Sequence, residues 1–446
     1  MITDAQLNDY FSYLRFPSIS ADPSRAGAMR DCANWLARKL TTLGFEAETR
    51  ENEGPPLVLA KRIGSPAKKT VLIYGHYDVQ PVDPLPLWHS DPFEPVVRDG
   101  FVVARGATDN KGQAACHLLG TEALLRERGE LPVNLIYLIE GEEEIGSPHF
   151  GKFLQARRDE LKCDAILVSD TSMAGVGFPA ITCGLRGIAC LEVRIRGPKM
   201  DLHSGMFGGA VANPAAVLTS LLARLHAEDG SVTVPGFYDG LLPVDPAERA
   251  RWKQIAFGDR AILDATGVSR LAGESGYTAV ERLWIRPTAE INGLTSGYQG
   301  DGSKTIIPRE ASAKLSFRLV PGQRPDDIAA KVRDYLQAIC PDTVDLEILY
   351  DHGGEPFYAD PKSAFSQAAQ TALQEVFGQP PALTREGLSI PIVSLLKDAL
   401  GIDPVLVGLG MADCQAHAPN ETFPLVQLEK GIAFHQRVLE RYAVLP

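Results

Sequence analysis

The sequence predicts an α/β protein in which a catalytic α/β domain, with a mixed, largely parallel sheet flanked by helices, is interrupted by a smaller α/β lid domain with an antiparallel sheet. Up to about residue 184, short apolar runs alternate with helical patterns, as in parallel sheets joined by crossover helices. From Gly187, three segments alternate between apolar and polar residues, as strands with one solvated face do. We therefore expect a catalytic domain from residues 1–185 and 359–446, and a lid and dimerisation domain from residues 186–358.

The first part of the catalytic domain contains one clear amphipathic helix and three strands. The helix covers Arg25–Leu43, carries apolar residues along one face and ends before Gly44. Three apolar runs predict strands: the run that ends at His76, Val133–Ile139 and Ala165–Ser169. Each of these runs stops where charged or imidazole side chains begin.

The lid is predicted from three alternating segments. They are Ile188–Ile195, Ala311–Val320 and Val344–Tyr350. Asn213 is the expected N-cap of a helix that begins at Pro214. The segment 235–287, rich in glycine, proline and charge, contains a helix-like patch and has no assigned place.

The catalytic domain resumes after the lid. Asp360 is the expected N-cap of a helix that Pro361 opens and Gly378 ends. A strand over Val405–Leu409 and a last helix over Leu425–Arg441 complete the chain. Residues far apart in the sequence are therefore expected to share one sheet.

Polar groups that suit a metal ion stand where the predicted strands end. They are His76, Asp78, Glu142–Glu144, Asp170 and His417, with Asp109 in a glycine-containing loop after the first strand. Taken singly, the acidic run Glu142–Glu144 is typical of a solvated face, and His417 is typical of an ordinary loop histidine. An open α/β sheet, however, gathers its strand ends into one crevice. Mixed histidine and carboxylate ligands suit Zn²⁺ first and Mn²⁺ or Co²⁺ next, and two such ions can share a bridging carboxylate.

These residues lie in five segments, GHYDVQPV, ARGATDNKGQ, EGEEEIGS, VSD and AHAPNE, and the chain also contains the segments DLHSGMFGG and REGLSIP. Together the segments resemble the M20 metallopeptidases, and most of all their carnosine-dipeptidase-type branch of cytosolic dipeptidases. The resemblance implies two divalent ions, with His76 and Asp170 on one, Glu144 and His417 on the other, and Asp109 bridging both. It also implies that Asp78 orients His76 and that Glu143 is the general base, in a register set by the trailing Gly146-Ser147. Glu142 receives no role.

Substrate contacts are expected from the lid and from one later loop. The resemblance implies that His203 reaches the active site of a neighbouring subunit and meets the oxyanion there, so that a homodimer is the active form. Arg318 falls on the polar side of its strand, where its guanidinium can clamp a free carboxylate. The resemblance adds Thr305 and Ser389 as substrate contacts.

We therefore expect a zinc-type di-metal hydrolase that cleaves the amide bond of dipeptides with a free C-terminal carboxylate, by a metal-bridged water that Glu143 activates. Two alternatives stay open: an amidohydrolase that uses the same site on N-acyl, N-carbamoyl or N-succinyl amino acids, and a non-catalytic metal- or peptide-binding protein. Loss of the general base or of a metal ligand would indicate the non-catalytic binding protein, but the sequence contains the base and all five ligands. A metallo-phosphoesterase would gain little from a carboxylate clamp. Thr171-Ser172-Met173 stands where eukaryotic members of the resembled branch carry aromatic residues, so the side-chain preference is open.

Composition narrows the class of partner. The net charge of −12 argues against nucleic acid and anionic membrane surfaces as partners, which leaves a small peptide or N-acyl amino acid as the substrate. The 7 cysteines form no closely spaced pair and predict reduced thiols. No signal peptide and no apolar run of membrane-spanning length is visible, so we expect a soluble, cytoplasmic protein.

Overall fold

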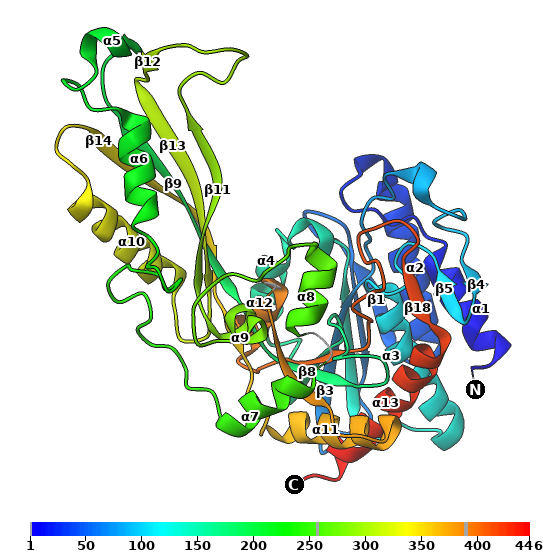
Figure 1. The fold of residues 1–446 in the computed structure, drawn as a ribbon. Coiled ribbons are helices and arrows are strands. Elements are labelled where there is room, and N and C mark those ends of the chain that lie inside the picture. The colour runs from blue at the N-terminus through cyan, green and yellow to red at the C-terminus, as the bar shows by residue number, and fades with distance from the viewer. Residues whose placement is uncertain (1, 256–257, 388–390) are drawn as a thin grey trace.

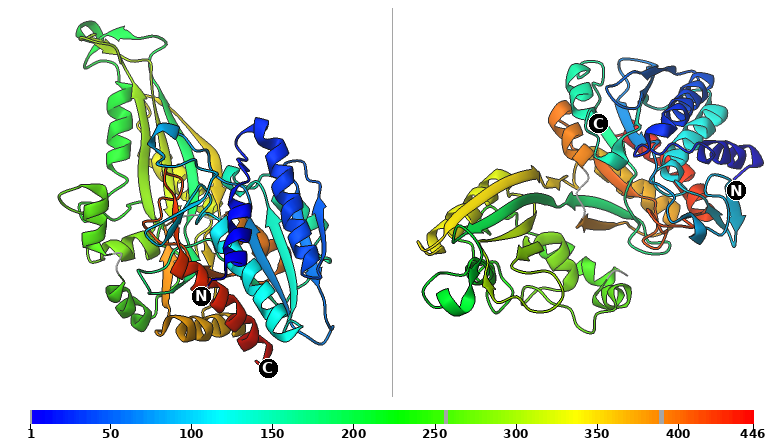
Figure 2. Two further views of the ribbon diagram at one scale, coloured as in Figure 1. Left: turned by 90° about the vertical axis from the view of Figure 1, so that its right-hand side faces the viewer. Right: turned by 90° about the horizontal axis from the view of Figure 1, so that it is seen from above.

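A computed structural model describes residues 2–255, 258–387 and 391–446. The chain forms a body, built on a nine-stranded sheet, and an arm, built on a four-stranded sheet that projects from the body (Figure 1). Views from the side and from above show the same separation of arm and body (Figure 2). The expected fold class, a helix-flanked mixed sheet with a separate antiparallel sheet, is confirmed.

The sheet of the body has its parallel strands at the centre. Its order is β1 (Glu46–Arg50), β2 (Leu57–Arg62), β6 (Asn134–Glu140), β3 (Thr70–His76), β7 (Ala165–Val168), β17 (Val405–Gly408), β8 (Ala180–Leu185) and β15 (Phe357–Tyr358), and β16 (Ala382–Glu386) also pairs with β8. The strands β6, β3, β7 and β17 run parallel to one another, whereas β1, β2 and β15 pair antiparallel. All four predicted strands of the body are therefore present, and their carboxyl ends share one edge.

Helices cover both faces of this sheet. One face packs against α1 (Asp4–Leu14), α2 (Ala26–Thr42), α3 (Lys111–Arg128), α11 (Ala364–Phe377) and α13 (Leu425–Ala443). The other packs against α4 (Phe150–Ala156) and α12 (Pro391–Leu400). Val71 and Ile73 face the first layer and Leu72 and Tyr74 face the second. Burial of both faces explains why these strands read as continuous apolar runs.

A small three-stranded sheet joins the two halves of the body. It consists of β18 (Thr422–Pro424), β5 (Phe101–Val103) and β4 (Val96–Arg98). Phe423 pairs with Val102, so the loop before β18 lies beside the loop after β5. This pairing places the segment of His417 next to that of Asp109, although the arm separates the two in sequence.

The arm is an antiparallel sheet with helices on one face. Its strand order is β11 (Thr288–Ser296), β13 (Glu310–Leu319), β9 (Gly187–Arg196) and β14 (Asp345–Gly354). α6 (Pro214–Ala223) and α10 (Pro325–Ile339) pack against its apolar face. The Asn213 side chain caps α6 as expected, accepting from the N–H of Ala215. At the far end of the arm lie β10 (Leu202–His203), β12 (Ile306–Ile307) and α5 (Ser204–Phe207) (Figure 1).

The segment with no expected place packs against the body. It forms α7 (Pro246–Arg251), α8 (Asp259–Thr266) and α9 (Ala279–Ile285). Trp252 and Trp284 are buried with Ala180 and Ala382 of the large sheet, and the Trp252 indole donates to the carbonyl of Leu383 at 2.9 Å. Part of the range 186–358 is therefore attached to the body, and the division into domains stays a prediction.

One predicted helix start is wrong. α11 begins at Ala364, and its N-cap is Ser363, whose hydroxyl accepts from the N–H of Ser366 at 3.3 Å. Asp360 instead closes a turn, because its carboxylate accepts from the N–H of Lys362 at 2.9 Å. The helix ends at Gly378 as expected, with φ 78°. Within the described ranges, no helix has the length and apolar character needed to cross a membrane.

Candidate metal centre

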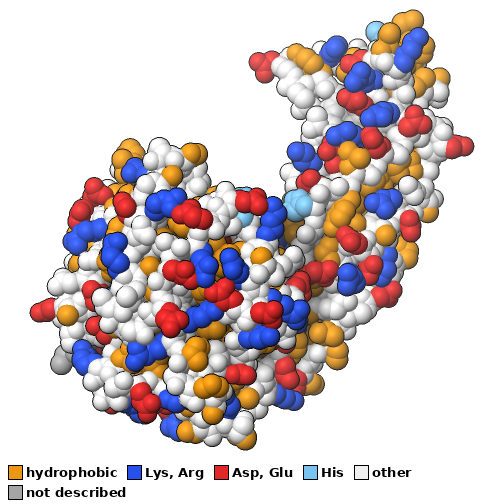
Figure 3. All heavy atoms as spheres, turned by 180° about the vertical axis from the view of Figure 1, so that it is seen from behind, with side chains coloured by type: hydrophobic (Ala, Val, Ile, Leu, Met, Phe, Trp, Pro, Cys, Tyr) orange, Lys and Arg blue, Asp and Glu red, His pale blue; other side chains and the backbone are white. Residues whose placement is uncertain are grey.

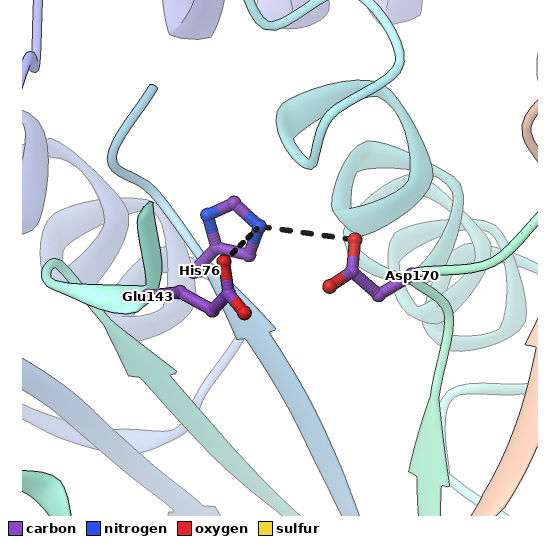
Figure 4. A group of neighbouring side chains, drawn as sticks. All are labelled: His76, Glu143 and Asp170. Carbon is purple, nitrogen blue, oxygen red and sulfur yellow. Dashed lines mark ion pairs between the residues drawn. The ribbon is translucent and has the colours of Figure 1, made fainter. Parts of the chain in front are cut away.

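The predicted ligands meet at the carboxyl edge of the large sheet. His76 is the last residue of β3, Asp170 follows β7, and Glu143 lies on the short helical turn Glu143–Ile145 after β6. Because β6, β3 and β7 are parallel neighbours, their ends bring these three side chains together (Figure 4). The Nε2 atom of His76 lies 3.8 Å from Asp170 Oδ1 and 4.0 Å from Glu143 Oε2. The three side chains form a group that could hold one metal ion.

A second group, of Asp109, Glu144 and His417, lies beside the first, and its Asp109 also contacts His76 of the first group. His417 Nε2 is 2.9 Å from Asp109 Oδ2 and 3.2 Å from Glu144 Oε2. The other oxygen of the same aspartate, Oδ1, is 3.2 Å from His76 Nε2. Asp109 therefore presents one oxygen to each histidine, which is the arrangement a bridging carboxylate needs.

Two residues orient these side chains from behind. Asp78 is fully buried; its Oδ1 lies 3.2 Å from Nδ1 of His76, and its Oδ2 accepts from the N–H of Glu144 at 3.0 Å. Asn110 donates to Asp170 Oδ1 at 2.8 Å. A polar partner on the far ring nitrogen turns Nε2 of His76 toward the centre of the site.

Glu421 supports the site and was assigned no role from the sequence. It is fully buried, and its carboxylate accepts from the N–H groups of Gly106, Thr108 and Asp109 at 2.7–2.9 Å. It also accepts from the guanidinium of Arg105 at 2.8 Å. Glu421 thus fixes the backbone of the loop that carries Asp109. Its position at the end of AHAPNE was the available signal, but nothing in that pattern shows that its partners are backbone groups.

Glu142 is a second supporting residue without a predicted role. It is 1% exposed and accepts from both the N–H and the Nδ1 of His149 at 2.9 Å. A Cβ atom at Gly54 would lie 2.4 Å from this carboxylate, so the chain approaches closely there. These contacts hold the turn that carries Glu143 and Glu144.

The protonation of the group reflects many carboxylates in a small buried volume. Burial raises the pKa of Glu143 to about 9 and that of Asp170 to about 6. Hydrogen bonds to Asp109 and Glu144 raise the pKa of His417 to about 10. Burial acts to raise the pKa of Asp109 as well, but the adjacent imidazoles of His417 and His76 outweigh burial and lower that pKa. In the metal-free protein, bound protons therefore reduce the negative charge of the clustered carboxylates. A metal cation would compensate the same negative charge.

The donor set fits divalent metal ions. Nε2 of His76 and Oε1 of Glu144 are buried and, within the described part of the chain, make no hydrogen bond. A buried polar atom without a partner is costly unless a ligand takes it. The two groups together offer imidazole nitrogen and carboxylate oxygen, the ligands that Zn²⁺ and related ions accept.

The predicted substrate contacts do not lie together in one chain. His203 and Thr305 are exposed at the far end of the arm, where the N–H of Ser204 donates to the carbonyl of Thr305 at 3.1 Å. Nδ1 of His203 accepts from the N–H of Gly205 at 2.9 Å. Arg318 is half-buried near the opposite end of β13. Ser389 lies outside the described residues.

The chain is similar in sequence and in fold to known peptidases. A family model described as peptidase family M20/M25/M40 matches residues 72–441. The Cys-Gly metallodipeptidase DUG1 of Candida albicans is 33% identical over 430 residues, which cover 92% of this chain and 88% of that protein. The Beta-Ala-His dipeptidase of Homo sapiens is 32% identical over 372 residues, which cover 82% of this chain and 73% of that protein. The structure of an M20 family metallo-carboxypeptidase, Sso-CP2 of Sulfolobus solfataricus, aligns with a TM-score of 0.81 and 32% identity, covering 99% of this chain and 100% of that one.

Proposed function

This chain belongs to peptidase family M20/M25/M40, and we propose that it is a metal-dependent dipeptidase that cleaves the amide bond of dipeptides with a free C-terminal carboxylate. Two of the similar proteins carry the name dipeptidase, one for Cys-Gly and one for Beta-Ala-His. The observation that carries the proposal is the position of Asp109, with one oxygen on each of two ligand groups.

The proposed ligand set is His76 and Asp170 on one ion, Glu144 and His417 on the other, and Asp109 between them. Each of these side chains belongs to one of the two groups described above or joins them. Zn²⁺ is the expected ion, with Mn²⁺ or Co²⁺ as substitutes. When bound, such ions supply a water molecule of lowered pKa and a positive charge for the scissile carbonyl.

Glu143 is the proposed general base. Its carboxylate lies 4.0 Å from His76 Nε2, in the group of His76 and Asp170. The group that contains Asp109 does not include Glu143. It takes a proton from the attacking water and returns that proton to the leaving amine. Asp78 holds the imidazole of His76 in the orientation that leaves Nε2 free toward the centre.

The proposed active form is a homodimer. His203 is the candidate donor to the oxyanion, yet it belongs to β10, which pairs with β12 at the end of the arm away from the large sheet (Figure 1). Within one chain its described neighbours are Gly205 and the residues of β12 rather than the metal ligands. A partner subunit would bring His203 and Thr305 to a second site, while Arg318 and Ser389 would contact the substrate from the same chain.

A substrate panel tests the proposal. Purified protein is loaded with Zn²⁺, Mn²⁺ or Co²⁺ and assayed on free dipeptides, β-alanyl dipeptides, N-acyl amino acids and N-carbamoyl amino acids. We expect hydrolysis of dipeptides that EDTA abolishes and added metal restores. Turnover of N-acyl or N-carbamoyl amino acids with no cleavage of dipeptides would contradict the dipeptidase and leave the metal chemistry in place.

A further inference from the structure

The turn that carries Glu143 and Glu144 is closed by the residue before it, Glu142. The backbone carbonyl of Glu142 accepts from the N–H groups of Ile145 and Ser147 at 3.2 and 2.9 Å. Ser147 has a φ of 51°, in the left-handed region that a residue other than glycine adopts only at a cost in free energy. Such a turn keeps its shape where the surrounding structure holds it.

The side chain of Glu142 supplies this support through His149. Glu142 is 1% exposed, and its carboxylate accepts from the backbone N–H and from Nδ1 of His149, both at 2.9 Å. Because an ionised carboxylate only accepts hydrogen bonds, Nδ1 carries the proton of this contact. The other ring nitrogen, Nε2, lies 3.9 Å from the exposed Glu53. The carboxylate of Glu142 thus ties the start of the turn to the residue that precedes α4.

The loop between β1 and β2 covers the contact of Glu142 with His149. The side-chain amide of Asn52 donates to Glu142 Oε1 at 3.4 Å, and Gly54 lies against the other oxygen, Oε2. A Cβ atom on Gly54 would collide with Oε2 and lie 3.0 Å from Nδ1 of His149. A residue without a side chain at position 54 therefore leaves the room that the buried carboxylate occupies.

The two glutamates on the turn differ in what else holds them. Glu144 has two anchors of its own, because its N–H donates to Asp78 at 3.0 Å and Gln80 donates to its carboxylate at 2.8 Å. The carboxylate of Glu143 makes no hydrogen bond with any residue that the structure describes, and it lies 4.0 Å from His76 Nε2 (Figure 4). The position of Glu143 therefore depends on the shape of the turn.

We infer that Glu142, through its contact with His149, is a positioning residue for Glu143, because it fixes the turn on which the proposed base stands. A general base must lie within hydrogen-bond reach of the proton that it takes. A misplacement of about 1 Å can lower the rate by about 100-fold. The inference rests on the proposed function, which makes Glu143 the base. Loss of Glu142 should then impair proton transfer more than metal binding.

The test measures kcat, KM and metal affinity on variants of both partners. Glu142→Ala and His149→Ala should each lower kcat by about 10- to 100-fold at saturating metal, with KM and metal affinity close to their wild-type values. His149→Asn keeps a donor near the position of Nδ1 and should recover part of the rate. Glu53→Gln is the matched control, because Glu53 faces the other nitrogen of the same ring, and it should keep the wild-type kcat.

A second pair of variants reaches the contact from the covering loop. Gly54→Ala places a methyl group against the carboxylate of Glu142 and should lower kcat while both partners stay in place. Gly64→Ala is its control, since a Cβ atom there would meet nothing within 4 Å. If thermal unfolding shows that Glu142→Ala does not fold, His149→Ala and Gly54→Ala decide.

The results distinguish a positioning role from a structural one. Variants that unfold at lower temperature but keep the wild-type kcat per metal-loaded chain would overturn the inference and leave Glu142 a stabilising residue. Metal loss in parallel with the loss of rate would also overturn it, because Glu144 would then be the residue that is displaced.

Failure of the proposed function gives different results. Wild-type activity in Glu143→Gln would refute the proposed base itself, whereas wild-type activity in the Glu142 and His149 variants beside an inactive Glu143→Gln would refute the role of Glu142 alone. If the wild-type enzyme cleaves N-acyl amino acids but no dipeptide, the dipeptidase proposal fails. The same variants assayed on the N-acyl amino acid then test Glu142 independently.

Discussion

Asp109 is the residue on which both halves of the candidate site depend. Its two oxygens face His76 and His417, and four hydrogen bonds to the buried Glu421 fix the loop that carries it. The proximity of His76, Asp170 and the Glu143–Glu144 pair was predictable, because each follows an apolar strand that ends at the same edge of the sheet. Glu421 was not, because its partners are chiefly backbone N–H groups of a distant loop, which leave no pattern in the sequence.

Replacement of Glu143 tests its role as the base. Glu143→Gln should retain both metal ions and lose about 10²- to 10⁴-fold in kcat, since it removes proton transfer and not a ligand. Metal content and kcat are measured on the same sample. The paired variant Glu144→Gln should lose metal instead. Metal loss in Glu143→Gln with retention in Glu144→Gln would mean that the two roles are exchanged.

Metal binding should release protons. In the metal-free protein, hydrogen bonds to Asp109 and Glu144 raise the pKa of His417 to about 10, so this imidazole is protonated near pH 7.5. A ligating imidazole is neutral, so loading the site should release at least one proton per chain. Calorimetric titration in buffers of different ionisation enthalpy measures this number. A metal-binding enthalpy independent of the buffer would contradict the protonation described here.

At the scale of elements, local sequence patterns predicted the strands and the helix whose formation depends on neighbouring residues in the chain. The strands β3, β6, β7 and β17 and the helix α2 were expected from apolar periodicity alone, and all are present. The start of α11 was misplaced because an Asp-Pro pair can form either a cap or a turn, and here the turn at Asp360 precedes the cap. The helices α7–α9 had no predicted place because their position depends on long-range packing of Trp252 and Trp284 against the body.

Two buried histidines join α3 to α13 and should make the fold sensitive to acid. Nδ1 of His117 lies 3.1 Å from Nδ1 of His435, and burial lowers the pKa of His117 to about 3 and that of His435 well below its ordinary value. Between about pH 6.5 and pH 3 the unfolded chain binds more protons at these positions than the folded chain does. The free energy of unfolding should therefore decrease as the pH is lowered through that window, by up to about 1.4 kcal/mol per pH unit for each histidine.

Denaturant unfolding of the metal-free protein at several pH values measures this dependence. His117→Leu removes one of the two groups, so the loss of stability between pH 7 and pH 5 should be smaller in the variant than in the wild type. Equal losses in both proteins would show that the pair does not contribute to acid sensitivity.

At the scale of the whole molecule, the arm separates residues that the proposed reaction needs together. It carries His203 and Thr305 to its far end, and it interrupts the body between the segments of Asp170 and His417. A hollow lies between arm and body on the face shown in Figure 3, where acidic and basic side chains are interspersed. The basis for proposing a homodimer is that, within one chain, His203 contacts Gly205 and β12 rather than the metal ligands.

Mixing two inactive variants tests whether His203 serves the partner subunit. His203→Ala and Glu143→Gln are each expected to lose nearly all turnover. In a mixed dimer, one site combines an intact Glu143 with the intact His203 of the other chain, so random exchange should restore about a quarter of wild-type activity. No recovery, with exchange verified by mass spectrometry of differently tagged chains, would contradict a role for His203 across the interface.

The measurement that tests the central claim most directly is the rate of dipeptide hydrolysis as the metal-free protein is titrated with Zn²⁺ or Mn²⁺. The two ligand groups, which Asp109 connects through its contacts with His76 and His417, predict that activity on a free dipeptide rises to its maximum at two bound ions per chain. Full activity at one ion per chain, or no hydrolysis at any loading, would contradict the two-metal dipeptidase.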